Sequence, residues 1–455
     1  MDNQHARTVH AVKVDFRQMM SLAGSAGGVQ AMTAVVGILT IKVVATLGSS
    51  AIAAVTSGQR LFFLIQSILF GLNIGAMALI AQSQGRGEHG EASHWLRVTL
   101  VLGVAVTIGL SVCFWWLAEP IMYSLGLTDP EALYEGASYI RELSLYCWFI
   151  AIYFIIASAL RALSIAWLPL ASGIFLNGTT LVLTYLLAGN WQYYTDSGSA
   201  AVAKAAGIGN LLGLILMLGL LYPRWREFFI ARWSLSGGRR LWRISYPAIM
   251  EQLFRQVAVL SFLWVVARYG TAPYAAYGAG IMLISVSFVV GYGFSVSANV
   301  MIGQAVGKDD LAMAKRILHV ALGFSLTVMT IMGLLLGIFC EPLSLWLIGE
   351  NDVTYYTSVF IYFFAVVQPV MAIDFVLTGA CQGTGDTRWP MFTVLVSNFV
   401  IRFGGAFILM LMDAPVEWIF GMIVLDYVVK TGLMCWRVFR QPWPRVVLNE
   451  VEAKS

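Results

Sequence analysis

The chain has 455 residues, of which 59% are hydrophobic and only 11% charged, with a net charge of +4 and a mean hydropathy of +0.78. A water-soluble protein of this length needs far more charge to cover its surface, so the composition excludes that class and indicates a polytopic membrane protein. The five cysteines are scattered through apolar segments without the spacing of a metal site. We therefore expect no disulfide, no bound metal and no nucleic-acid partner.

Twelve apolar runs are long enough to cross a bilayer, which takes about 20 residues each. The polar segment before the first run has no cleavable signal-peptide pattern. We therefore expect an all-α polytopic membrane protein with about twelve transmembrane helices. The predicted spans lie near residues 20–47, 55–82, 94–118, 136–160, 168–189, 199–222, 245–268, 272–303, 315–339, 354–381, 390–412 and 415–438.

The two halves of the chain repeat each other. The segment that begins at Ile80 reappears at Ile302, 222 positions later, and further along the spacing becomes 221. Six spans return the chain to its starting side, so the repeats are parallel rather than inverted. The sequence thus predicts two pseudo-symmetric six-helix bundles. Their bounds are an N-terminal bundle at 1–222, an Arg-rich cytoplasmic linker at 223–244, and a C-terminal bundle with a cytoplasmic tail at 245–455.

Positive residues are unevenly distributed between the loops. The even-numbered loops carry most of them, for example Arg86, Arg161 and Arg388, whereas the odd-numbered loops hold only Lys204 and Arg268. Cytoplasmic loops are enriched in Lys and Arg, so this bias places both termini in the cytoplasm. We expect a multi-pass protein of the inner (plasma) membrane, surrounded by the lipid bilayer.

Several short motifs occur in the same order in which a known family has them. Gln304–Asp309, with Ala312 and Ala314 after it, resembles the G-Q-x-x-G…A…A segment that follows the second and eighth spans of the multidrug and toxic compound extrusion (MATE) family. Gly383–Pro390 is similar to that family's turn between spans ten and eleven, and Tyr139–Arg141 matches its Y-[IL]-R motif. The resemblance covers nearly the whole chain, from about residue 15 to residue 437.

The motif residues have a structural interpretation. We expect Gly307, Gly383 and Gly385 to supply positive φ angles for tight reversals, and Asp386 to accept hydrogen bonds from loop amides in an Asx-type turn. We interpret these turns as hinges at the membrane surface rather than as ligand contacts. Gln82 and Gln304 lie just before the turns that follow the second and the eighth predicted span, one in each half.

The resemblance implies a secondary antiporter. Members of the family expel cationic or amphipathic organic molecules in exchange for H⁺ or Na⁺, so we expect a small-molecule substrate, alternating access between the two bundles, and no cofactor beyond the coupling ion. We expect a monomer. The alternative is a flippase of the same superfamily for a lipid-linked or polyprenyl intermediate. An enzyme is not expected, because the histidines form no catalytic cluster. The sequence has no Walker-type ATP-binding motif, so we do not expect ATP to be the energy source.

Charged side chains inside the predicted spans are concentrated in the second half, and such residues are costly and usually functional. Counting residues from the span ends places Arg402 and Asp426 near the midplane on consecutive antiparallel spans. We interpret them as a structural ion pair that holds spans eleven and twelve together, with Lys430, one turn from Asp426, as a second partner.

Glu251 and Asp374 are the candidate coupling residues. Both lie roughly 9–11 Å deep from the same membrane face, and two acids at one depth form a cluster that can take up a proton or Na⁺. The resemblance supports this interpretation, since many family members place acids in spans seven and ten. The alternative is an i,i+4 pair between Glu251 and Arg255 that neutralises the acid permanently. The repeat places Gln30 opposite Gln252, and we add both glutamines to the candidate coupling-ion or substrate site.

Overall fold

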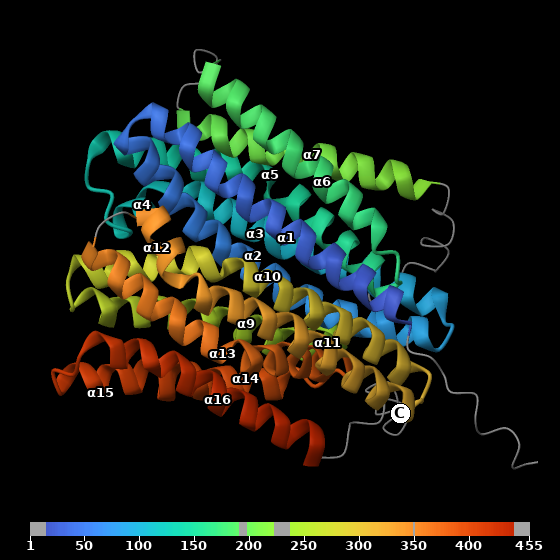
Figure 1. The fold of residues 1–455 in the computed structure, drawn as a ribbon. Coiled ribbons are helices and arrows are strands. Elements are labelled where there is room, and N and C mark those ends of the chain that lie inside the picture. Colours follow the sequence, from blue (N-terminus) through green and yellow to red (C-terminus); the bar gives the residue numbers. More distant parts are fainter. Residues whose placement is uncertain (1–14, 191–197, 223–236, 349–350, 441–455) are drawn as a thin grey trace, which may run out of the picture.

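The computed structural model describes residues 15–190, 198–222, 237–348 and 351–440, and nearly all of these are helical (Figure 1). Twelve of the described helical segments are long and apolar enough to cross a membrane. In a lipid bilayer the backbone must satisfy its own hydrogen bonds, which a continuous helix does without help from other segments. The predicted all-α membrane fold with twelve spans is confirmed.

The first half supplies six spans and one short helix. Asp15 caps the first span by accepting a hydrogen bond from the Gln18 amide at 3.1 Å, and Asp129 caps the fourth in the same way, with Pro130 in its first turn. The spans are α1 (Phe16–Val44), α2 (Ser49–Gly85), α3 (His89–Trp116), α5 (Pro130–Ala162), α6 (Trp167–Thr184) and α7 (Gly198–Leu221), with α4 (Ala118–Ser124) after α3. A 3₁₀ turn at Ala45–Leu47 extends α1, and a π-helical turn at Tyr185–Asn190 extends α6.

The second half repeats this order, but its fifth span is built from three pieces. The other spans are α9 (Gly238–Ala267), α10 (Thr271–Gly307), α11 (Leu311–Ile338), α13 (Asn351–Gly383) and α16 (Val416–Arg440), with the short α12 (Cys340–Ile348) after α11. The three pieces are α14 (Arg388–Leu395), the π-helical η6 (Val396–Gly404) and α15 (Gly405–Leu411). Residues 223–236 of the predicted linker lie outside the described residues, and α9 begins at Gly238 rather than at residue 245.

The two halves form two bundles that lie side by side, with α1 and α2 of the first against α9 and α10 of the second (Figure 1). One buried apolar core contains residues from both bundles, such as Leu79 and Ile302. It lies near the turns at 85–89, 162–167, 307–311 and 383–388, and we refer to this side as the motif end. Towards the opposite end each bundle has a core of its own, around Met122 in the first and Phe360 in the second. Within the described part of the chain, the bundles therefore share a core at the motif end and have separate cores towards the other end.

Two symmetry-related hydrogen bonds join the bundles at the motif end. The Gln82 amide nitrogen donates to the carbonyl oxygen of Gly383 at 2.9 Å, and the Gln304 amide nitrogen donates to that of Ala162 at 2.8 Å. Gln82 and Gln304 are repeat partners, and so are Ala162 and Gly383, which lie 221 positions apart. Each bundle thus donates one of these hydrogen bonds to the other and accepts one from it.

The motif glycines have a different role from the predicted one at two of three positions. Gly307 and Gly383 lie within helices and do not have positive φ angles, so that prediction is wrong for them. A Cβ atom on Gly307 would lie 2.1 Å from the carbonyl oxygen of Gln82, and one on Gly383 would lie 2.4 Å from that of Asn299. The absence of a side chain is what permits these close backbone approaches.

The turn after α13 forms as predicted. Gly385 has a φ angle of +87°, and one Asp386 carboxylate oxygen accepts a hydrogen bond from the Trp389 amide at 3.3 Å. The other oxygen forms an ion pair with Arg437 on α16 at 2.6 Å. Asp386 therefore fixes both the start of α14 and the end of α16.

We expect the substitution Gly307→Ala to lower the free energy of unfolding, and with it the Tm, because the added methyl group displaces the α2 backbone. The usual cost of such overpacking is about 1–3 kcal/mol. The measurement is the Tm of the purified protein in detergent. Gly323→Ala in α11 is the matched control, since a Cβ atom there meets nothing within 4 Å. Equal Tm changes in both variants would contradict the close approach of α2 and α10.

Candidate functional site

Six charged side chains of the second bundle meet between α9, α13, η6 and α16 and form three ion pairs. Glu251 pairs with Arg255 at 2.7 Å, Asp374 pairs with Lys430 at 2.7 Å, and Asp426 pairs with Arg402. Each acid has its own base, which agrees with the high cost of an uncompensated charge inside a membrane protein.

Glu251 is fully buried, and both of its carboxylate oxygens are engaged. One accepts a hydrogen bond from the Arg255 guanidinium, one helical turn away, and the other accepts from the Gln382 amide at 3.3 Å. The Arg255 side chain is 32% exposed. Among the described residues Glu251 and Asp374 share no hydrogen-bond or ion-pair partner, since Glu251 contacts Arg255 and Gln382 and Asp374 contacts Lys430.

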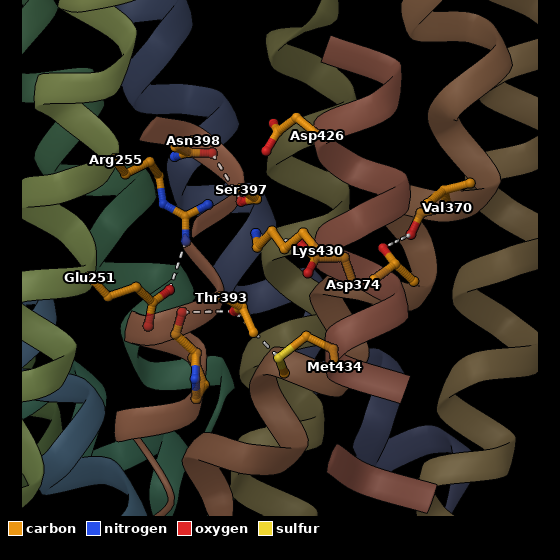
Figure 2. Close-up of polar contacts among 12 residues, drawn as sticks. Glu251, Arg255, Val370, Asp374, Thr393, Ser397, Asn398, Asp426, Lys430 and Met434 are labelled. Atoms are coloured by element: carbon orange, nitrogen blue, oxygen red, sulfur yellow. Dashed lines mark hydrogen bonds and ion pairs between the residues drawn. The ribbon is translucent and has the colours of Figure 1, made fainter. Parts of the chain in front are cut away.

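Asp374 forms its ion pair with α16 instead of with Glu251. Its carboxylate accepts a hydrogen bond from the Lys430 ammonium, so the predicted pairing of Lys430 with Asp426 is wrong (Figure 2). Lys430 and Asp426 are one turn apart on α16, but the ammonium group reaches α13. The second carboxylate oxygen of Asp374 is buried and has no hydrogen-bond partner among the described residues.

The predicted ion pair between Arg402 and Asp426 is confirmed. Arg402 belongs to the π-helical segment η6, and wide turns of this kind occur often at functional sites. Its guanidinium also lies 5.5 Å from the ring centre of Tyr427, and the Lys430 ammonium lies 5.7 Å from the same ring. The Tyr427 ring therefore sits between two of the three ion pairs.

The ion pairs adjoin a cavity of about 90 Å³ in the second bundle. Its charged lining consists of Arg255, Arg402, Lys430 and Asp426, with Asn398 and Tyr427 beside them. This volume holds a few water molecules or a small ion, but no drug-sized molecule. A larger apolar cavity of about 590 Å³, lined by α13, α15 and α16, contains none of the six charges.

The two candidate glutamines lie apart from the acids. Gln252 is half-buried on α9, and its side chain leaves the helix about 100° away from that of Glu251. Gln30 is half-buried on α1 and lines a smaller cavity in the first bundle. Within the parts of the chain that the structure describes, no three His, Cys, Asp or Glu side chains gather as they would around a metal ion.

Three residues next to the charges were not predicted from the sequence, namely Gln382, Asn398 and Tyr427. Two of them carried a usable signal. Asn398 is the repeat partner of Asn177, and Gln382 directly precedes the motif glycine Gly383. A polar residue inside an apolar span carries an energetic cost, so its presence indicates a functional site.

Comparisons with known proteins agree with the repeat and the fold. A family model described as MatE matches residues 26–186 and again residues 247–408, once in each half. A protein of Rhizobium meliloti named "Probable multidrug resistance protein NorM" is 26% identical over 450 residues, which cover 93% of each chain. A protein of the same name from Thermotoga maritima is 20% identical over 399 residues, covering 86% of this chain and 85% of the relative. Among solved structures, a mutant of the Vibrio cholerae MATE transporter VcmN superposes with a TM-score of 0.86 at 17% identity, covering 94% of this chain and 97% of that one.

Proposed function

Because the chain belongs to the MatE family, we propose that it is a secondary active antiporter of the inner (plasma) membrane and not an enzyme. It exports organic small molecules, cationic or amphipathic, in exchange for H⁺ or Na⁺. The names of the relatives, which are multidrug resistance proteins, support export of organic compounds over the flippase alternative. The similarity covers both bundles, which supports the assignment of the relatives' function to this chain.

The observation that carries the proposal is the fully buried Glu251 carboxylate, which pairs with Arg255 in the same bundle as the buried Asp374. Burial favours the uncharged form of a carboxyl group, whereas an adjacent guanidinium favours the ionised form. An acid under both influences can change its charge when its surroundings change. H⁺ or Na⁺ taken up at Glu251 and Asp374 replaces Arg255 and Lys430 as the partners of these acids, and a cationic substrate can take the same place instead. Occupancy by one excludes the other, which is the requirement for exchange.

The arrangement of the cores supports alternating access. The bundles share an apolar core and two reciprocal glutamine bonds at the motif end, and they have separate cores towards the opposite end. The positive loops support a cytoplasmic position for the motif end. In the proposed cycle, this arrangement is the one closed to the cytoplasm. Opening the cytoplasmic side then requires that the bonds from Gln82 and Gln304 break.

The proposed orientation predicts a labelling pattern. In a variant without the natural cysteines, a cysteine at the exposed position Glu88 reacts only with a reagent that reaches the cytoplasm, and one at the exposed position Thr128 reacts from outside. Both positions are exposed and lie in loops at opposite ends of the bundles. A difference in their labelling therefore reports the side of the membrane on which each lies. Labelling of both from one side would contradict the topology.

The coupling ion is tested in everted membrane vesicles that carry the protein. If H⁺ is the coupling ion, we expect efflux of a cationic dye to stop when the pH gradient is collapsed. If Na⁺ is the coupling ion, we expect it to stop when the Na⁺ gradient is collapsed. Vesicles from cells that do not produce the protein provide the background. Dye efflux that persists without both gradients, and that requires ATP, would contradict secondary antiport.

A further inference from the structure

A second charged site, in the first bundle, contains a base without an acid. Arg161 lies in the last turn of α5 and is only 7% exposed. None of the described acidic side chains forms an ion pair with it, and its Nε atom is buried without a hydrogen-bond partner. The three deep bases of the second bundle each have an acid, so Arg161 stands apart from them.

Arg161 faces a cavity of about 20 Å³, which has room for one particle about the size of a water molecule. Asn73 lines the same cavity and is 4% exposed, and among the described residues it has no hydrogen-bond partner for its amide nitrogen or its amide oxygen. None of the described residues that line the cavity is acidic. Its lining comes from α1, α2 and α5 of the first bundle, together with Tyr292 and Val296 on α10 of the second.

The internal repeat shows that this cavity is the counterpart of the Glu251 site. At a spacing of 222, Val29 occupies the place of Glu251, and at a spacing of 221, Tyr153 occupies the place of Asp374. Arg161 corresponds to Gln382, which donates to Glu251 in the second bundle. Val29 and Tyr153 both line the cavity. The two acids of one site are thus replaced by Val29 and Tyr153 in the other, where Arg161 supplies a base. The Glu251 site balances its charges with ion pairs, whereas the related site has a positive charge without a described acid beside it.

We infer that the Arg161 cavity binds a small inorganic monovalent anion of the size of chloride. A buried guanidinium without a counter-ion is costly, and an anion compensates its charge while accepting hydrogen bonds from Arg161 and the Asn73 amide nitrogen. The small volume excludes an organic acid. Because α10 completes the lining, the bound anion favours the arrangement in which the two bundles are packed together at the motif end.

The test measures the Tm of the purified full-length protein in detergent as chloride replaces gluconate at constant ionic strength and pH. A ligand that binds only the folded state raises Tm in a saturable manner, so we expect a rise of several degrees that levels off. In Arg161→Gln the chloride-dependent rise is lost. In Asn73→Asp the new carboxylate serves as a permanent counter-ion, so the protein is stable without chloride and does not respond to it.

Arg141→Gln is the matched control, because Arg141 lies on the same helix but pairs with Glu119 at 2.8 Å away from the cavity. It retains the full response. The inference is overturned if chloride has no saturable effect on the wild-type protein, if Asn73→Asp responds as the wild type does, or if acetate raises Tm and chloride does not. The readout is independent of transport, so its failure leaves the proposed antiport untouched.

Discussion

Replacing Asp426 with Asn, or Arg402 with Gln, is expected to reduce the amount of folded protein sharply, whereas the double replacement restores most of it. Asp426 is 1% exposed and the Arg402 side chain 12% exposed, so each single variant leaves a charge buried without its partner. The cost is about 3–5 kcal/mol. That is a large fraction of the roughly 5–15 kcal/mol that stabilises a typical folded protein. The double variant removes both charges together.

The measurement is the yield of monodisperse protein after extraction from membranes. Arg141→Gln again serves as the control, since its pair with Glu119 is exposed and such pairs contribute only about 0–1 kcal/mol. A double variant as poorly produced as either single variant would contradict the assignment of Arg402 and Asp426 as a structural pair.

The second large effect is expected at Glu251. Glu251→Gln should leave folding and dye binding largely intact but reduce coupled efflux in vesicles to the background rate. The amide has nearly the shape of the carboxylate and keeps a contact with Gln382, but it cannot take up or release a charge. Asp374→Asn leaves the buried Lys430 ammonium without its partner, so we expect it to lower the yield of folded protein as well as coupled efflux. The exposed acid Glu119 is the control, and Glu119→Gln should transport at the wild-type rate.

Arg255→Ala distinguishes coupling from a purely structural role for Glu251. If Arg255 only tunes the acid, this variant still transports, with altered ion dependence. If the i,i+4 pair is structural, Arg255→Ala is produced as poorly as a variant with a stranded charge, and adding Glu251→Gln restores production. Restoration of that kind, or normal efflux in Glu251→Gln, would contradict the coupling role.

The spans and the repeat could be predicted because lipid imposes a simple rule on sequence. Every crossing must be a long apolar helix, and its length is visible in the chain. The pair of Arg402 and Asp426 followed from the same reasoning, since depth along two consecutive spans is a matter of counting. The π-helical turn that contains Arg402 was not predicted, because its hydrogen-bond shift leaves no mark in an apolar sequence.

Contacts between spans that are distant in the sequence could not be predicted. Helical spacing placed Lys430 near Asp426, and depth placed Asp374 near Glu251, but which side chains meet depends on how the helices are arranged and rotated. The structure instead pairs Lys430 with Asp374 across α13 and α16. Gln382 was missed for the same reason. The role of Gly307 was misassigned because a glycine that permits a positive φ angle and one that permits close packing look alike in a sequence.

The most direct test of the proposed antiport is ion release on substrate binding to the purified protein. In weakly buffered detergent solution, adding a cationic dye to the wild-type protein should release H⁺, seen with a pH indicator, or Na⁺, seen with a sodium-sensitive electrode. Glu251→Gln should bind the same dye and release no ion. Dye binding to the wild-type protein without release of either ion, or equal release from Glu251→Gln, would contradict exchange at the Glu251 and Asp374 carboxylates.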